Sequence, residues 1–383
     1  MRGDIPLSSC VPAYTNGVRK MNLRKFKTLV KLVKKEFFSI FCFKIAKNNV
    51  YSKEDYLNAF LYLTQRHSAY SGSAQMKYLK EQSPDSDSML YTLRKSPDSA
   101  YQDLLIEITD KLLNMCFKIG VFKRSYEFDV GIDYHDRPYH GDKNDEGVVG
   151  SKKEPHWAYR FATIDIIEKG CTFTIFMLPF KELDSDKNIV NKLLSEAKKR
   201  IRINCLYADA EFMSAELIDT YEKQKINYIV RAKSSYVYKI EAQHEKSTSF
   251  EYVRKRYVNK YPVTTKTTWV INIFEKYGEI KKESYYTNLK VTKRTIDQFY
   301  LQYDKRWNIE IDYRTNNNFM PRTCTKSYTI RVFYFILSLI MRNVLMYINL
   351  LLKQKSSMWY SERALLSSFN FVFLIAIVPH LQK

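Results

Sequence analysis

The chain has 383 residues and a strong excess of basic side chains: Lys and Arg number 62 against 41 Asp and Glu, a formal net charge of +21. This length allows about two or three domains with a large buried core. The charge favours a polyanionic partner, nucleic acid first and an anionic membrane surface second. Six cysteines occur without any Cys-x-x-Cys pair, which argues against a zinc ribbon or a disulfide framework.

The apolar runs do not suggest a membrane protein. The longest are residues 332–341, bracketed by Arg331 and Arg342, and residues 371–378. Both are shorter than the roughly 20 residues that span a bilayer. Residues 1–10 also lack the charged-then-apolar order of a signal peptide. We therefore expect no membrane partner.

Residues 1–119 are expected to form an all-α, DNA-binding region. Apolar and basic residues alternate with helical spacing at 19–48, which predicts an amphipathic helix. This helix either lies along DNA phosphates or presents a solvated basic face. Residues 101–119 predict a long amphipathic connector helix that leads into the next domain.

Between these segments, residues 52–96 predict three short helices separated by a Ser-Pro-Asp break. A helix-turn-helix at 73–95 fits this pattern, and generic three-helix packing fits it as well. Arg94 and Lys95 stand near the end of the proposed recognition helix. They are therefore the candidates in this region for contact with DNA.

Residues 125–232 change to a pattern of three strands followed by helix, strand, helix and strand. This order predicts an α/β fold with a mixed sheet flanked by helices, the ribonuclease-H-like arrangement. The first strand ends on Asp133, and Asp209 follows a short buried strand at 203–208. Because ligands of open α/β sheets collect at the carboxyl ends of strands, we expect both carboxylates at one edge.

Residues 233–294 are β-rich and basic and form an insertion ahead of the last helices. Strands are predicted at 267–275 and 284–292, around a turn at 276–278.

Residues 295–352 are expected to complete the catalytic domain, and residues 353–383 to form a C-terminal tail. The segment 295–314 lacks Gly and Pro and predicts one continuous helix. A loop at 316–321 and a long apolar helix that caps the sheet are expected to follow. The apolar face of the first helix is expected to consist of Ile296, Phe299, Tyr300, Tyr303, Trp307 and Ile311.

Tyr303, Arg306 and Glu310 are separated by three and four residues, so one helix would carry them along one stripe. A phenol, a guanidinium and a carboxylate on one stripe can bind a metal and a phosphate side by side. The alternative is a solvated Arg–Glu pair on a helix surface, which stabilises the helix only slightly.

Asp133, Asp209 and Glu310 come from three separate elements. Three such carboxylates can converge to hold two divalent cations about 3.5–4 Å apart, which activate a water or a 3′-hydroxyl for attack on a phosphodiester. Carboxylate and water ligands suit Mg²⁺ or Mn²⁺ rather than zinc.

Other sites remain open at this point. A different metal site is possible among His135, His140, His156, Asp133, Asp136 and Asp142. Glu211 and Asp219 rival Asp209, but neither ends a buried strand. Glu283 rivals Glu310, but it lacks the Arg and Tyr around it.

Tyr303, Arg306 and Glu310 resemble the Y-(2)-R-(3)-E part of the signature of DDE insertion-sequence transposases. In that family a β-rich insertion also lies between the second Asp and the Glu. The signature ends with a Lys, and Asn317 stands at its position here.

The strand motif Val-Gly-Ile-Asp-Tyr-His around Asp133 resembles the first catalytic Asp of the family. Asp209, with Phe212 at the usual offset of three residues, resembles the second. The similarity extends over residues 125–350. Arg322 or Lys326 are the candidates to replace the DNA contact of the signature lysine.

The resemblance implies a transposase that cuts DNA and joins its 3′ end to a target, with Asp133, Asp209 and Glu310 as catalytic ligands of two Mg²⁺ or Mn²⁺ ions. Tyr303 and Arg306 would contact DNA phosphate. It also implies terminal inverted repeats and target DNA as partners, a homodimer in the synaptic complex, and a nucleoid-associated place in a prokaryotic cytoplasm. An inactive copy that only binds DNA and a related metal-dependent nuclease remain the alternatives.

Overall fold

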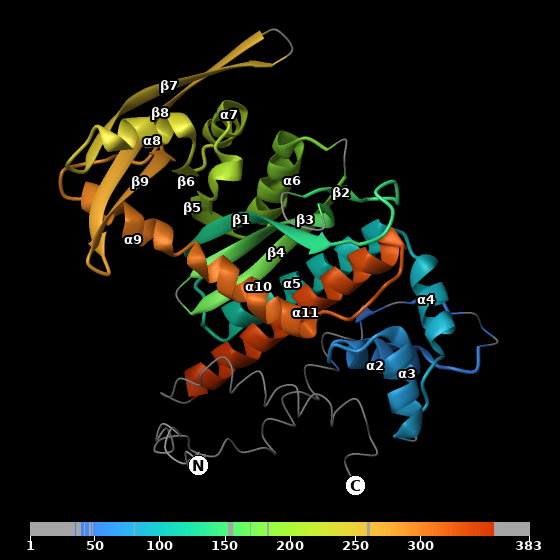
Figure 1. Ribbon diagram of the computed structural model, residues 1–383. Coiled ribbons are helices and arrows are strands. Elements are labelled where there is room, and N and C mark those ends of the chain that lie inside the picture. The colour runs from blue at the N-terminus through green and yellow to red at the C-terminus, as the bar shows by residue number, and fades with distance from the viewer. Residues whose placement is uncertain are drawn as a thin grey trace, which may run out of the picture.

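The computed structural model describes Lys35 and residues 40–355, apart from 42, 46, 48, 80, 152–155, 169, 182–183 and 259–260. The predicted basic helix at 19–48 and the C-terminal tail lie largely outside the described residues. The described part contains a nine-stranded sheet with helices on both faces and a helical unit at one end (Figure 1).

The first six strands form the mixed sheet that the element order predicted. They are β1 (Glu127–Pro138), β2 (Val149–Gly150), β3 (Trp157–Glu168), β4 (Cys171–Phe180), β5 (Arg202–Ala208) and β6 (Tyr228–Ala232). β1, β3 and β4 pair in an antiparallel meander, whereas β5 and β6 add in parallel beside β1. β3 and β4 are buried along almost their whole length because helices cover both faces of the sheet. The ribonuclease-H-like fold class is thereby confirmed.

The insertion continues this sheet. It contains α8 (Ser235–Ala242), β7 (Thr248–Val258), β8 (Tyr261–Lys276) and β9 (Glu279–Thr287). β9 pairs with β6, so the strand order is β2-β3-β1-β5-β6-β9-β8-β7. In the predicted turn, Tyr277 and Gly278 have φ angles of 58° and 77°, as a two-residue hairpin turn requires. The strand predicted at 284–292 begins and ends later in the chain than β9 does. The sequence did not predict β7, because charged residues interrupt its apolar pattern.

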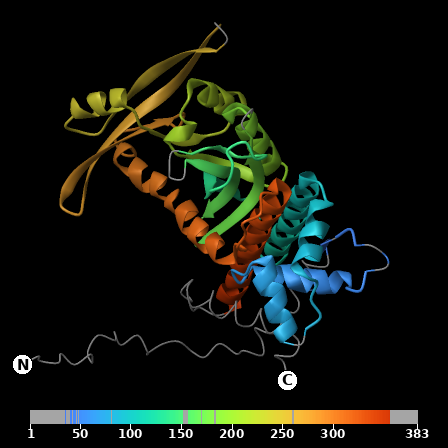
Figure 2. The ribbon, with the colours of Figure 1, turned by 45° about the vertical axis from the view of Figure 1, so that its right-hand side comes forward.

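Helices cover the sheet in two layers. α6 (Asp186–Lys198) and α7 (Ala215–Lys223) pack beside each other on one face, while α5 (Asp98–Lys118) and α11 (Tyr328–Lys355) lie side by side on the other (Figures 1 and 2). α5 therefore belongs to the layers of the catalytic domain and is not a free connector. The hydrophobic core is continuous across the division expected at residue 119.

α11 is a core helix. Among the described residues it is the one helix long and apolar enough to cross a membrane, yet 83% of its most apolar window is buried inside the protein. Its Phe333 ring lies 5.3 Å from Phe60 and 4.8 Å from Tyr101, so three helices meet there.

The N-terminal unit consists of α2 (Lys53–Leu63), α3 (Ala69–Tyr78) and α4 (Ser86–Arg94). The three predicted short helices are thus present. The link between α3 and α4 is longer than the turn of about three or four residues that joins a helix-turn-helix. α4 also packs against α11, so only its exposed face is available to a partner. Recognition of DNA by this unit stays a prediction.

The segment expected as one helix at 295–314 is broken. A 3₁₀ turn at Ile296–Gln298 leads into α9 (Phe299–Asp304), and α10 (Trp307–Phe319) follows. At the break, the Arg306 amide donates to the carbonyl of Tyr303 at 2.9 Å, an i to i+3 bond of the tighter 3₁₀ kind.

The break changes which side chains face the sheet. Ile309 is completely buried, whereas Trp307 is 51% exposed and was wrongly expected on the buried face. α10 then runs to Phe319, so the predicted loop from residue 316 is helical instead.

α10 lies directly on β1 at a glycine. A Cβ atom added to Gly131 would lie 2.1 Å from Cδ1 and 3.1 Å from Cγ1 of Ile309. A Cβ atom at this position would therefore force the end of the Ile309 side chain to move, and glycine allows the helix to lie this close without that movement.

We expect Gly131→Ala to lower the free energy of unfolding by about 1–3 kcal/mol, because the added methyl group overpacks this contact. Urea unfolding at equilibrium measures the change. Ile309→Val removes the clashing Cδ1, so the double variant should lose less than the sum of the two single losses. Strictly additive losses would contradict the close contact.

Candidate active site

The end of the parallel ladder between β1 and β5 brings two carboxylates together. The last pair of that ladder is Ile132 with Ala208, so Asp133 and Asp209 are the next residues on neighbouring strands. Asp133 does not end its strand as expected, because β1 continues to Pro138 in its pairing with β3. It stands instead where the parallel pairing ends, which is the edge the sequence predicted for both residues.

Arg306 links the strand carboxylate to the helix carboxylate. Its Nη1 lies 3.5 Å from Oδ2 of Asp133, and its Nη2 lies 2.7 Å from Oε1 of Glu310. The arginine side chain is only 11% exposed. A largely buried guanidinium between two carboxylates is not the solvated surface pair considered as the alternative.

Tyr303 completes this group from the end of α9. Its hydroxyl donates a hydrogen bond of 3.3 Å to the carbonyl of Ala208, the residue before Asp209. Burial raises the pKa of Tyr303 above its usual range, so the phenol remains a hydrogen-bond donor at neutral pH. The structure therefore brings together all five residues that the sequence predicted for this site.

The carboxylates influence one another electrostatically. Burial raises the pKa of Asp133 to about 7, and the negative charges of Asp209 and Glu211 act in the same direction. Arg306 and the amide of Tyr134 oppose the shift. Without a bound metal ion, the Asp133 carboxyl therefore takes up a proton at a higher pH than an ordinary aspartate does.

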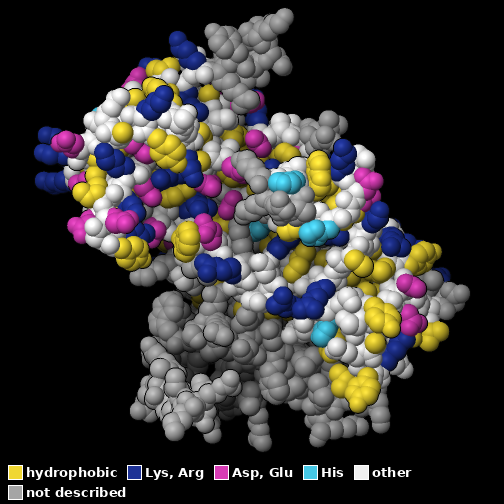
Figure 3. All heavy atoms as spheres, in the orientation of Figure 1, with side chains coloured by type: hydrophobic (Ala, Val, Ile, Leu, Met, Phe, Trp, Pro, Cys, Tyr) yellow, Lys and Arg dark blue, Asp and Glu magenta, His cyan; other side chains and the backbone are white. Residues whose placement is uncertain are grey.

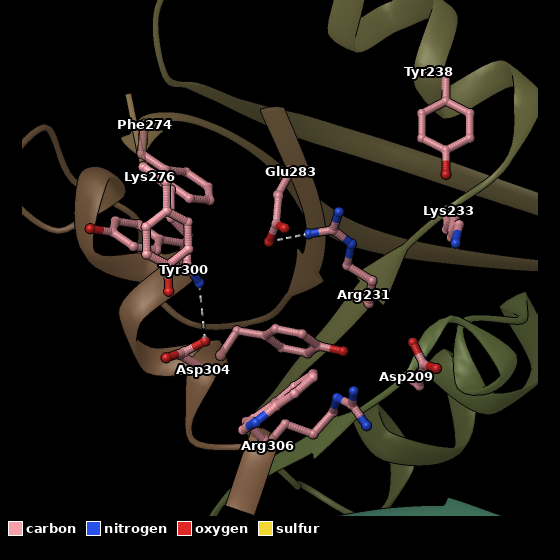
Figure 4. A pocket seen from close by; sticks show the side chains of 13 residues that line it. Asp209, Arg231, Lys233, Tyr238, Phe274, Lys276, Glu283, Tyr300, Asp304 and Arg306 are labelled. Carbon is pink, nitrogen blue, oxygen red and sulfur yellow. Dashed lines mark ion pairs between the residues drawn. The ribbon is translucent and has the colours of Figure 1, made fainter. Parts of the chain in front are cut away.

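A cleft of about 610 Å³ opens beside the carboxylates (Figure 4). Asp209 and Arg306 face it from the end of β5 and from the break between α9 and α10. Its other lining residues are Arg231, Lys233, Tyr238, Phe274, Lys276, Tyr277, Glu283, Tyr300, Tyr303, Asp304 and Trp307. Cationic and aromatic side chains of this kind suit a nucleic-acid strand.

Sequence reasoning missed most of this lining. Arg231 and Lys233 come from the end of β6, and Lys276 comes from the hairpin of the insertion. Only the pairing of β6 with β9 brings them to one place, and no spacing in the sequence signals that pairing. On the face seen in Figure 3, Lys and Arg side chains are spread over the insertion and the helical part, with acidic ones between them.

The rival carboxylates have other partners or places. Glu283 forms an ion pair with Arg231. Asp219 pairs with Lys223 along α7, 2.7 Å away. Glu211, on the short turn after Asp209, lies near enough to act on the Asp133 carboxyl.

The histidine alternative is wrong. His135 is buried, with Nε2 3.4 Å from the Thr163 hydroxyl and its ring 5.3 Å from Phe335. His140 and His156 are exposed. Within the described residues, no group of three or more His, Cys, Asp or Glu side chains is arranged to hold a metal ion.

That finding includes the three catalytic candidates, two of which contact the guanidinium of Arg306. The donor set nevertheless fits a hard divalent ion, because it consists of carboxylate oxygens alone. The ion pairs of Arg306 show that Asp133 and Glu310 already face one position of positive charge.

The position of the signature lysine lies on the surface of α10, where this chain has Asn317. Asn317 is exposed, and its side-chain oxygen accepts a hydrogen bond from Arg137 at the end of β1. Arg322 and Lys326 are exposed on the link between α10 and α11.

Arg94 and Lys95 lie elsewhere. They are exposed at the end of α4, at the opposite end of the molecule from α9 and the insertion (Figure 1). The Nζ of Lys95 lies 4.2 Å from the centre of the Tyr91 ring.

Comparison with known proteins agrees with the fold. Residues 175–344 match the family described as Transposase DDE domain, a range that contains Asp209 and Glu310 and begins after Asp133. The structure is similar to that of piggyBac transposase in a cryo-EM synaptic complex with hairpin DNA, with a TM-score of 0.56 and 12% sequence identity. The similarity covers 94% of this chain and 79% of that one. No curated protein matches the chain.

A ribonuclease-H-like sheet that carries a transposase domain defines an enzyme of DNA transposition and recombination. Residues 175–344 therefore contain a transposase DDE domain, within a fold that is similar to that of a known transposase. Enzymes of this class bind DNA, cleave it and transfer its strands, and the class generally uses divalent metal ions.

Asp133→Asn should change how stability depends on pH in metal-free buffer. The folded-state pKa of about 7, against an ordinary value of 3.8, means that the folded wild type holds an extra proton between these values. Its stability therefore falls as the pH rises through this window, whereas the Asn variant has no such proton to lose. Relative to wild type, the variant should gain about 1–4 kcal/mol between about pH 4 and pH 8.

Urea unfolding in the presence of EDTA measures this difference. Asp219→Asn is the control, because it removes a carboxylate of α7 that pairs with Lys223. A difference between the Asp133 variant and wild type that stays constant with pH would contradict the buried, protonated carboxyl.

Proposed function

We propose that the chain catalyses metal-dependent DNA cleavage and strand transfer of an insertion sequence. The observation that carries this proposal is the position of Arg306, whose guanidinium contacts both Asp133 and Glu310 beside the strand end that holds Asp209. Two carboxylates thus contact one guanidinium and the third stands on the neighbouring strand end, which supports a site of the kind used in two-metal phosphoryl transfer.

In this proposal Asp133, Asp209 and Glu310 hold two Mg²⁺ or Mn²⁺ ions. When bound, such ions activate the attacking hydroxyl and stabilise the leaving oxygen of an in-line displacement. The carboxylates must be ionised to serve as ligands, so Asp133 releases its proton before the site is competent.

Tyr303 and Arg306 are the proposed contacts to the DNA backbone. Both line the cleft beside the carboxylates, and a guanidinium presents two parallel N–H groups that match a phosphate. Although burial disfavours the charge, Tyr303 and the neighbouring carboxylates raise the pKa of Arg306 above its ordinary value. The side chain therefore carries its positive charge at any working pH.

We also propose that the chain belongs to the subgroup with the Y-R-E-K signature, although Asn317 stands at the position of the signature lysine. Arg137, hydrogen-bonded to Asn317, supplies a guanidinium beside that position. We also propose terminal inverted repeats and target DNA as partners, a homodimer in the synaptic complex, and a nucleoid-associated place in a prokaryotic cytoplasm.

Asp133→Asn, Asp209→Asn and Glu310→Gln should each stop cleavage of DNA that carries the terminal repeats. We expect losses larger than the roughly 100-fold that removal of a group supporting a metal ligand causes. Binding of the same DNA should persist, because the phosphate contacts remain. A nicking assay with Mg²⁺ or EDTA, together with a gel-shift titration, measures both quantities.

Asp219→Asn serves as the matched control and should cleave like wild type. Joined products with target DNA separate a transposase from a nuclease. Cleavage that continues in any of the three carboxylate variants would remove that residue from the proposed site.

Arg94→Ala and Lys95→Ala should weaken binding to terminal-repeat DNA. A lost phosphate contact lowers the slope of log affinity against log salt by about one, equally for specific and random duplex. A lost base contact removes about 1–3 kcal/mol from the specific duplex only. Gel-shift titrations at several salt concentrations distinguish these cases.

Lys118→Ala, at the exposed end of α5, is the control for a general loss of positive charge. If neither variant at the end of α4 differs from it, the helices α2 to α4 serve packing, and specificity resides elsewhere.

A further inference from the structure

β1 carries a second buried carboxylate that the proposed chemistry does not use. The side chain of Asp129 is only 4% exposed. It accepts hydrogen bonds from Nδ2 of Asn204 at 2.7 Å and from Nζ of Lys305 at 2.5 Å. Asp129 stands four residues before Asp133, about 13 Å along the strand, so the two carboxylates cannot share a pair of cations.

Lys305 stands at the break between α9 and α10, directly before Arg306. The two neighbouring cations reach two carboxylates on the same face of β1, Lys305 contacting Asp129 and Arg306 contacting Asp133. Between these contacts, Ile309 packs on the glycine of the strand. Three successive positions on one face of β1 therefore each receive a side chain from this short segment.

The local structure of β1 directs Asp129 toward this contact. The register between β1 and β5 shifts between Phe128 and Asp129, and such a bulge changes the direction of a side chain. A carboxylate this deeply buried is strongly destabilising without a positive partner. Although burial lowers the pKa of Lys305, its hydrogen bond to Asp129 raises it overall, so the lysine stays charged.

We propose that Lys305 and Asp129 form a positioning pair, which fixes α10 along β1 and thereby sets where Arg306 and Glu310 stand relative to Asp133. Neither residue of the pair touches the reacting atoms. The inference rests on the proposed function, since it assigns a role toward the same three carboxylates.

The break between the helices explains why such a pair is needed. The 3₁₀ turn leaves α9 and α10 without a continuous set of i to i+4 hydrogen bonds, so the geometry of the break is not fixed by the helix itself. Phe299 of α9 and Ile309 of α10 belong to one small hydrophobic cluster, and Ile309 also packs on Gly131 of β1. An ion pair at the junction fixes the second helix relative to the first.

The test uses the full-length protein with Lys305→Met, which keeps the apolar stem, and Lys305→Arg, which keeps the charge. Lys187→Met is the matched control, because Lys187 is similarly exposed and pairs with Glu216 at 3.5 Å on the other face of the sheet. Four quantities are measured: Mn²⁺ affinity by electron paramagnetic resonance, the single-turnover cleavage rate on pre-bound terminal-repeat DNA, DNA affinity, and the thermal midpoint.

Lys305→Met should bind Mn²⁺ and cleave DNA about 10- to 100-fold less well, as for other groups that orient metal ligands. Its DNA affinity should remain within about twofold, since the phosphate contacts are kept. Lys305→Arg should recover most of the loss, and Lys187→Met should match wild type in all four measurements.

An unchanged Mn²⁺ affinity in Lys305→Met would overturn the positioning role. A loss of Mn²⁺ affinity that is just as large in Lys305→Arg would also overturn it. So would a loss of Mn²⁺ affinity that is accompanied by comparable losses of DNA affinity and thermal stability. A wild type that binds Mn²⁺ but does not cleave contradicts the proposed function and leaves the metal affinities to decide the positioning role. A crystal structure of Lys305→Met with α10 unmoved on β1 also overturns it, whatever the activity.

Discussion

The contact between Ile309 and Gly131 sets the distance between α10 and the sheet. Because β1 has no side chain at this position, the helix lies close enough for Arg306, which also contacts Glu310, to reach the carboxylate of Asp133. A larger residue at the glycine would push Ile309 outward, and the contact between Arg306 and Asp133 would lengthen, whereas Arg306 and Glu310 would move together. The electrostatics of the site thus depend on a steric feature of the strand.

The site must also accommodate several like charges in a buried place. The structure does so in two ways, by placing a guanidinium between two of the carboxylates and by raising the pKa of Asp133 until a proton can neutralise it. Both compensations are reversible. The same buried geometry can therefore persist without cations and still present oxygen ligands to them.

Much of this arrangement could be predicted from the sequence. The order of strands and helices predicted the mixed sheet, and the places of Asp133 and Asp209 at the end of parallel strands predicted that they would meet. The spacing of Tyr303, Arg306 and Glu310 predicted a shared site. The three residues still lie together, although the helix is broken between α9 and α10. These features are local patterns or follow from general rules of sheet topology.

What the sequence did not predict depends on contacts between distant segments. The break after Lys305 leaves no mark in the helical periodicity, because it is held by tertiary contacts with β1. The cationic lining of the cleft requires the pairing of β6 with β9. The packing of α5 on α11 depends on a helix more than 200 residues away in the sequence. The pattern Asp129, Gly131, Asp133 was visible as alternate positions of one strand, but its partners were not.

The hydrogen-bonded ladder between β6 and β9 has a mechanical consequence. It runs from the pair of Ile229 with Thr287 to the pair of Ala232 with Ser284, without a flexible linker between the insertion and the catalytic strands. The insertion is therefore coupled to the catalytic strands by backbone hydrogen bonds. A displacement of its long hairpin would be passed across neighbouring strands as shear, toward the ends of β5 and β1 where the carboxylates stand.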